Sequence, residues 1–278
     1  MKTKNKIIQL IFTFQKKIKY DRIDVYAAQA SFYCIMSAVP VLMLLFTLLQ
    51  YTPLSQENVM EVLSNILNAG MMETVNEVVE NVYRGSVTLV SFAAVSLLWV
   101  AGKMMIGLTN GLNNIHKLSE NRNYFLLRFR ASFYTVLMVA ALILAIMILV
   151  FGFRFQSFLS SIFPLLAKME KLMIYLQTLI ALCLITVIFN SLYVFLPNRK
   201  RRYFSQFPGA IFATLSWCTF SYFFNIYLSY AKNMSVIYGG LVTLVVAMLW
   251  LYFCMYLWFL GAEINAYLEN KASFDVTL

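Results

Sequence analysis

The chain has 278 residues, of which 61% are hydrophobic and only 12% are charged, and its formal net charge is +10. A soluble domain has about a quarter of its residues charged, so this chain cannot cover itself with a surface that faces water. Its basic residues lie in short loops between long apolar stretches and not on one soluble face. This pattern excludes a nucleic-acid-binding protein and indicates a membrane protein whose partners are lipids.

The N-terminal segment predicts an amphipathic helix at the membrane interface. Apolar residues recur there at helical spacing, with lysines before and after them: Ile7, Ile11, Phe14 and Ile18. No small-x-small cleavage site follows, which argues against a signal peptide. A helix of this kind lies on the anionic inner leaflet.

Six stretches are long and apolar enough to cross a membrane, which takes about 20 residues per helix. Each must be helical, because an open strand leaves its backbone groups unpaired in lipid. We therefore predict an all-α polytopic membrane protein with six transmembrane helices in one domain, residues 1–278. The spans are residues 31–50, 86–108, 131–153, 174–196, 208–230 and 237–262.

The segment between the first two spans, residues 56–84, carries two apolar stripes separated by Asn68-Ala69-Gly70, with glutamates on the other faces. We interpret it as two short amphipathic helices folded over the outer mouth of the bundle. A lid or a partner surface is the functional interpretation. A packed cap with a solvated acidic side is the one we favour, since runs of charge usually face water.

The distribution of Lys and Arg predicts the orientation. Most of them lie in the N-terminal segment and in the loops after the second and fourth spans, whereas the alternate loops carry few. The positive-inside rule then places both termini in the cytoplasm.

Ionisable and amide side chains in or beside the spans are the candidate site residues, because such groups are costly in lipid. They concentrate near the predicted inner side, where Lys103 and Glu263 could pair. We name this set the polar collar and interpret it either as a site for a lipid headgroup or small polar solute, or as a hydrogen-bonded clamp that fixes helix ends. Its members are Lys103, Glu263, Gln29, Asn265, Asn110 and Asp24.

Other residues are expected to shape the helices. Pro40 removes a backbone hydrogen bond from the middle of the first span and should kink it. Small residues let two helices approach closely, which favours a packing role over ligand contact. The glycines concerned are Gly102, Gly107, Gly111, Gly239 and Gly261.

Motifs for catalysis are not found in the sequence. The single histidine, His116, falls in a predicted loop, and the four cysteines are far apart. No phosphate-binding glycine loop and no nucleophile elbow occurs. We expect no catalytic residue, no metal, no cofactor and no ATPase activity, and hence no enzyme.

Segments of three predicted spans resemble signatures of the YihY/virulence factor BrkB family, whose members are often labelled ribonuclease BN-like. Residues 27–33 (AAQASFY), followed by Ser37 and Pro40, are similar to its first span, and residues 208–210 (PGA) to its fifth. Residues 238–240 (YGG), 249–252 (LWLY) and 260–266 (LGAEINA) are similar to its last span. The resemblance implies a six-helix bacterial inner-membrane protein with cytoplasmic termini.

Two functions follow as hypotheses. The first is a membrane transporter or flippase-like protein for a lipid or amphipathic solute of the cell envelope, with Lys103 binding an anionic group. The second is a scaffold that transports nothing and organises envelope enzymes through residues 56–84. A nuclease is not expected, because the histidines and acids of a metal site are missing.

Overall fold

A computed structural model gives the fold. The structure describes residues 12–49, 60, 76, 80, 87–140, 170–199, 201–230 and 240–269. Residues 12–20 and 124–140 are helical as well as the elements named next. These are α2 (Ile23–Leu49), α5 (Val87–Ile115), α8 (Glu170–Phe195), the short 3-10 helix η1 (Tyr203–Gln206), α9 (Phe207–Tyr230) and α11 (Gly240–Glu269).

Five of these helices are long and apolar enough to cross a membrane. Large apolar side chains face outward along them, and Phe92, Phe223 and Val245 are each more than 60% exposed. In water such a surface would drive aggregation, whereas lipid tails solvate it. The prediction of an all-α polytopic membrane protein is therefore confirmed. The third predicted span, residues 131–153, falls partly outside the described residues, so the count of six remains a prediction.

The helices extend past the predicted spans at one end of the bundle, and three boundaries need correction. α2 begins at Ile23, α5 continues to Ile115 and α11 continues to Glu269. Asn110 and Asn265, which follow the predicted second and sixth spans, therefore lie inside helices. Hydropathy identifies only the apolar part of a helix. The helix itself continues through polar residues, because its hydrogen bonds join backbone groups and do not depend on the polarity of the side chains.

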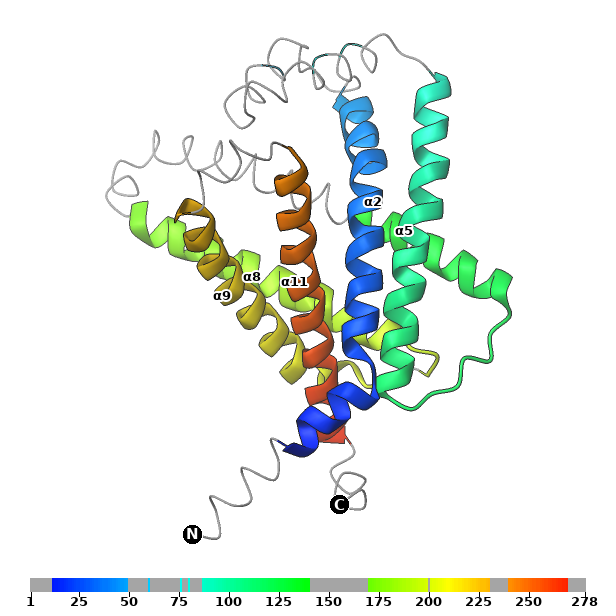
Figure 1. Cartoon of the computed structure of the whole chain (residues 1–278), viewed down its shortest axis with the longest axis vertical. Helices are drawn as coiled ribbons and strands as arrows, with labels where there is room; N and C mark the ends of the chain where they lie inside the picture. The colour runs from blue at the N-terminus through cyan, green and yellow to red at the C-terminus, as the bar shows by residue number, and fades with distance from the viewer. Residues whose placement is uncertain are drawn as a thin grey trace.

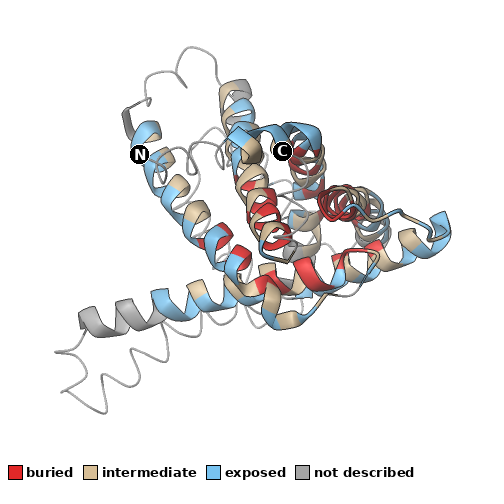
Figure 2. Cartoon of the chain, turned by 90° about the horizontal axis from the view of Figure 1, so that it is seen from below, coloured by how far each residue is buried: buried red, intermediate tan, exposed pale blue. Residues whose placement is uncertain are grey.

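The helices pack in a fixed order (Figure 1). α2 lies beside α5, α11 packs against α2, α9 packs against α11, and α8 packs against α9. Residues 12–20 lie across the end of the bundle at which α2 begins and α5 and α11 end. We call this the charged end. Viewed from there, the buried residues gather where the helices meet, and outward faces are exposed (Figure 2).

Glycines set the closest helix contact. A Cβ atom on Gly209 of α9 would lie 2.1 Å from the carbonyl oxygen of Gly261, and one on Gly261 would lie 2.5 Å from that of Gly209. Only residues without a side chain allow two backbones to approach this closely. The backbone N–H of Gly209 donates to Asn265 Oδ1 at 2.7 Å, and Asn265 Nδ2 donates to the carbonyl of Gln206 at 2.9 Å. Asn265 thus caps the start of α9, where helix N–H groups have no partner of their own.

The other helix-shaping residues lie as follows. Gly111 faces Phe259, Gly107 faces Gln29 and Gly102 faces Arg128. Pro40 is buried inside α2, which continues beyond it to Leu49. Gly239 lies outside the described residues.

Candidate functional site

Four titratable side chains meet at the charged end, and we call them the ion cluster: Lys17, Asp21, Lys117 and Glu263. Lys17 Nζ lies 2.7 Å from Asp21 Oδ2 and also pairs with Glu263. Lys117 pairs with the other oxygen of Asp21. Both carboxylates are fully buried, while the two lysines remain partly exposed.

The local sequence explains the geometry around Asp21. Lys17 and Asp21 are four residues apart, so they share one face of the helix. The helix of residues 12–20 then ends, since Arg22 adopts a left-handed backbone with φ of 50° and α2 leaves in a new direction. The carbonyl of Asp21 accepts a hydrogen bond from Asn114 Nδ2 at 2.7 Å, which joins this turn to the end of α5.

Lys117 is positioned by the cap of α5. Its backbone is left-handed with φ of 53°. The N–H of Leu118 donates to the carbonyl of Asn113 and the N–H of Lys117 donates to that of Asn114, which is the Schellman pattern of helix ends. The side chain of Lys117 then passes over the ring of Tyr20, with Nζ 4.0 Å from its centroid, to reach Asp21.

Electrostatics at this end favour an ionised Asp21 and a neutral His116. Burial alone would raise the pKa of Asp21, but interactions with Glu263 and the two lysines outweigh it and lower the pKa. His116 is buried, and neither ring nitrogen has a hydrogen-bond partner among the described residues. Burial, and then the charges of Arg201 and Lys17, lower the pKa of His116 to about 3.

Lys103 does not belong to this cluster, so the expected pairing of Lys103 with Glu263 needs correction. Its ammonium lies 5.5 Å from the ring centroid of Tyr33 and 5.7 Å from that of Trp99. Because α5 continues to Ile115, Lys103 is about 18 Å from the end of that helix at 1.5 Å per residue. Glu263 pairs with Lys17 instead.

The remaining members of the polar collar are dispersed. Asn265 caps α9, as described above, and Gln29 packs against the backbone of α5 at Gly107. Asn110 is half-buried in α5. Asp24 is exposed in the first turn of α2. Sequence patterns did not mark Lys17, Asp21 and Lys117 as site residues, although the spacing of Lys17 and Asp21 directly before the first span was a usable signal.

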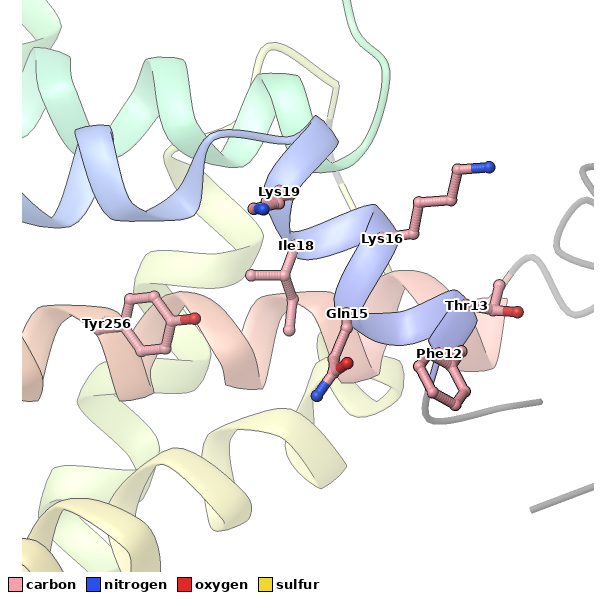
Figure 3. A pocket seen from close by; sticks show the side chains of 7 residues that line it. All are labelled: Phe12, Thr13, Gln15, Lys16, Ile18, Lys19 and Tyr256. Atoms are coloured by element: carbon pink, nitrogen blue, oxygen red, sulfur yellow. The ribbon is translucent and has the colours of Figure 1, made fainter. Parts of the chain in front are cut away.

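A cleft lies between residues 12–20 and α11 (Figure 3). Its larger lobe has a volume of about 640 Å³. An adjoining lobe of about 270 Å³ shares Ile18, Lys19 and Tyr256 with it. The larger lobe is otherwise lined by Phe12, Thr13, Gln15 and Lys16, and the smaller one by Asp24, Tyr252 and Phe253.

The cleft combines an apolar wall with a charged rim. Phe12, Ile18 and Phe253 offer apolar surface, while Lys19 and Asp24 bring opposite charges. The helix of residues 12–20 therefore connects two features, because Lys17 reaches the ion cluster while its neighbour Ile18 faces the cleft. The volume falls in the range of ligand pockets, about 300–1,000 Å³.

The part of the chain that the structure describes contains no set of side chains that could bind a metal ion. No three side chains of His, Cys, Asp or Glu gather there in a way that could hold an ion.

Comparison with known proteins assigns the family. The model of the family described as virulence factor BrkB matches residues 14–277. YfkH of Bacillus subtilis, whose name describes it as ribonuclease-like, is 29% identical over 88% of this chain and 90% of its own length. A UPF0761 membrane protein of Photobacterium profundum is 27% identical over 94% of this chain and 81% of its own.

A UPF0761 membrane protein of Vibrio parahaemolyticus is 26% identical over 92% of this chain and 81% of its own. No solved structure matches the chain. The family match covers almost the full sequence and agrees with the resemblance in the first, fifth and last spans. The chain is therefore a member of the virulence factor BrkB family of multi-pass membrane proteins.

Proposed function

We propose that the protein is a transporter or flippase-like protein that handles a lipid or amphipathic solute in the bacterial cell envelope. The observation that carries the proposal is the cleft between residues 12–20 and α11, with apolar walls and a charged rim. A lipid has the same division, since its headgroup is charged and its chains are apolar. A small polar solute would gain nothing from Phe12, Ile18 and Phe253.

The charge pattern supports a cytoplasmic location for the cleft. Residues 12–20 carry Lys16, Lys17 and Lys19, and the loops at the same end add Lys117 and Arg122. Lysine and arginine gather on the cytoplasmic side of membrane proteins, so the charged end faces the cytoplasm in this proposal. Each basic residue near an anionic leaflet contributes about 1 kcal/mol of attraction.

Lys103 has a separate role in the proposal. It lies deeper between α2 and α5, beside Tyr33 and Trp99, where a second contact for an anionic group would be needed on the way outward. A cation at this depth is costly, which is the usual mark of a functional residue in a membrane helix. The proposal includes no catalytic step and no nucleotide.

Reconstituted vesicles test the proposal. Phospholipids with a fluorescent chain are placed in both leaflets, and a membrane-impermeant reductant reports how fast inner-leaflet lipid reaches the outside. We expect wild-type protein to accelerate this movement over protein-free vesicles. Ile18→Trp, which fills the cleft, should slow it at least several-fold, and Lys103→Gln should also slow it.

The matched control is Phe223→Trp, a substitution on the exposed face of α9. It should leave the rate unchanged. Equal rates with and without protein, or equal rates for wild type and Ile18→Trp, would overturn the proposal. The scaffold hypothesis rests on residues 56–84, which lie outside the described residues except Met60, Asn76 and Glu80, so it remains a prediction.

A further inference from the structure

We propose that the cleft selects a phospholipid whose headgroup carries both a phosphate and a primary ammonium, as phosphoethanolamine does. Lys19 binds the phosphate, and Asp24 with Tyr252 and Tyr256 binds the ammonium. The inference deepens the proposed function by naming the class of lipid. It requires a lipid-binding cleft but does not require that the lipid be moved.

Lys19 is the cation placed to meet a phosphate. It lines both lobes, so its side chain lies where they join. Lys16 lines only the larger lobe, and Figure 3 shows its side chain extending away from Tyr256. Lys17 is already paired with Asp21 and Glu263. Of the three lysines in residues 12–20, Lys19 is thus the one that lies at the join of the two lobes.

The smaller lobe carries the opposite charge. Asp24 is exposed and lines this lobe together with the rings of Tyr252 and Tyr256. A carboxylate accepts charge-assisted hydrogen bonds, and aromatic faces attract cations. A primary ammonium has three N–H donors for such a site, whereas a trimethylated choline has none. An uncharged glycerol headgroup would leave Asp24 unpaired, and an anionic lipid would gain nothing from it.

The charges facing the join match a zwitterion. Lys19 and Asp24 are the charged residues that line the smaller lobe, and they are five positions apart in the sequence. Phe12, Ile18 and Phe253 supply apolar surface next to them for the first part of the acyl chains. A cleft meant only for anionic lipids would need no acid at this position.

Asp24 could also serve only to stabilise α2, and this role has to be distinguished from lipid binding. An acidic residue in the first turn of a helix is stabilised by the helix dipole, and Asp24 is in the first turn of α2. That account predicts a loss of stability in Asp24→Asn without any change in lipid preference. The inference predicts a change in preference.

The experiment measures which lipid the full-length protein retains. Purified protein is equilibrated with an equimolar mixture of phosphatidylethanolamine, phosphatidylglycerol and phosphatidylcholine, and bound lipid is identified by native mass spectrometry. We expect phosphatidylethanolamine to be retained about tenfold over each of the others, the effect of one charge-assisted hydrogen bond. Asp24→Asn should abolish this preference while phospholipid binding persists. Lys19→Gln should weaken the retention of all three lipids.

Arg202→Gln is the matched control, because it removes an exposed charge that lines neither lobe, and it should keep the wild-type preference. Several results would overturn the inference: no preference in the wild type, a preference for phosphatidylglycerol, or an Asp24→Asn variant that is less stable but equally selective. Selection without lipid movement in the vesicle assay would uphold this inference and reject transport. Movement without selection would do the reverse.

Discussion

His116 shows at the scale of single residues what burial without a partner does to a titratable group. It is the only histidine in the chain, and its pKa falls to about 3 in the folded protein from an ordinary 6.5. Below pH 6.5 the unfolded chain binds a proton at His116 more readily than the folded protein does, which favours unfolding. Above pH 6.5 the histidine is neutral in both states, and the free energy of unfolding is not reduced by its protonation. The free energy of unfolding then falls by about 1.4 kcal/mol per pH unit as the pH is lowered from 6.5 toward 3.

The variant His116→Phe isolates this effect. Phenylalanine fills a similar space and gives up no hydrogen bond, because both ring nitrogens lack a partner among the described residues. We expect wild type to lose stability relative to His116→Phe as the pH is lowered from 6.5 to 4, measured by thermal unfolding of purified protein. Parallel pH profiles for the two proteins would show that the histidine is not held neutral.

Asp21 is the second residue whose charge state matters. Replacing its buried carboxylate in Asp21→Asn removes the ion pair of Lys117 and one of the ion pairs of Lys17. Removing one partner of a buried pair costs about 3–5 kcal/mol of unfolding free energy. Since the pKa of Asp21 is lowered on folding, this stabilisation is present above about pH 4 and is lost as the pH falls through the folded-state pKa.

The control is Glu120→Gln, which breaks the pair of Glu120 with Arg122 in a more exposed loop. It should cost less than about 1 kcal/mol. Equal losses for Asp21→Asn and Glu120→Gln in thermal unfolding near neutral pH would show that the ion cluster contributes nothing beyond an ordinary surface pair.

At the scale of helices, the crossing of α9 and α11 depends on two glycines. Gly261→Ala or Gly209→Ala would place a Cβ atom within 2.5 Å of a carbonyl oxygen on the facing helix, so the backbones must separate. Overpacking of this kind costs about 1–3 kcal/mol. Thermal unfolding should show that loss for both variants.

Gly102→Ala is the matched control for the glycine variants. The nearest atoms to its new Cβ belong to the flexible side chain of Arg128, at 3.2 Å. The substitution also gains up to about 1 kcal/mol of helix propensity. We expect a neutral or slightly stabilising effect. A loss as large as that of Gly261→Ala would mean that the close backbone contact is not what limits the crossing.

The elements also show how far sequence patterns reach. Long apolar runs predicted five helices that the structure contains, because crossing lipid leaves the backbone no alternative to a helix. The same hydropathy placed the start of α2 too late and the ends of α5 and α11 too early, and so placed Lys103 too near the end of α5. The contact of Lys17 with Glu263 joins positions 246 apart. Local periodicity carries no information about such a pair.

The site was predicted only in part. Glu263, Asn265 and Asp24 stood out as polar groups beside apolar runs, which marks residues but does not say which of them meet. Asp21 and Lys117 are brought together by two left-handed turns, at Arg22 and Lys117, that no apolar pattern announces. The cleft depends on the angle at which residues 12–20 leave α2, and it could not be foreseen.

At the scale of the whole molecule, the proposed function depends on the orientation of the protein in the membrane. The ion cluster, the cleft and the ends of α5 and α11 lie at one end of the bundle. If that end faces the cytoplasm, the cleft opens toward the inner leaflet and can receive lipid made inside the cell. If it faces outward, the positive-inside pattern and the proposed direction of lipid entry both fail.

Thiol labelling tests this most directly. In a chain whose four cysteines are replaced, single cysteines are introduced as Tyr20→Cys at the charged end and Asn76→Cys in the segment between the first two spans; both native side chains are exposed. Intact cells are treated with a membrane-impermeant maleimide, before and after permeabilisation. If the charged end faces the cytoplasm, we expect labelling of Asn76→Cys in intact cells and of Tyr20→Cys only after permeabilisation. Labelling of Tyr20→Cys in intact cells would contradict it.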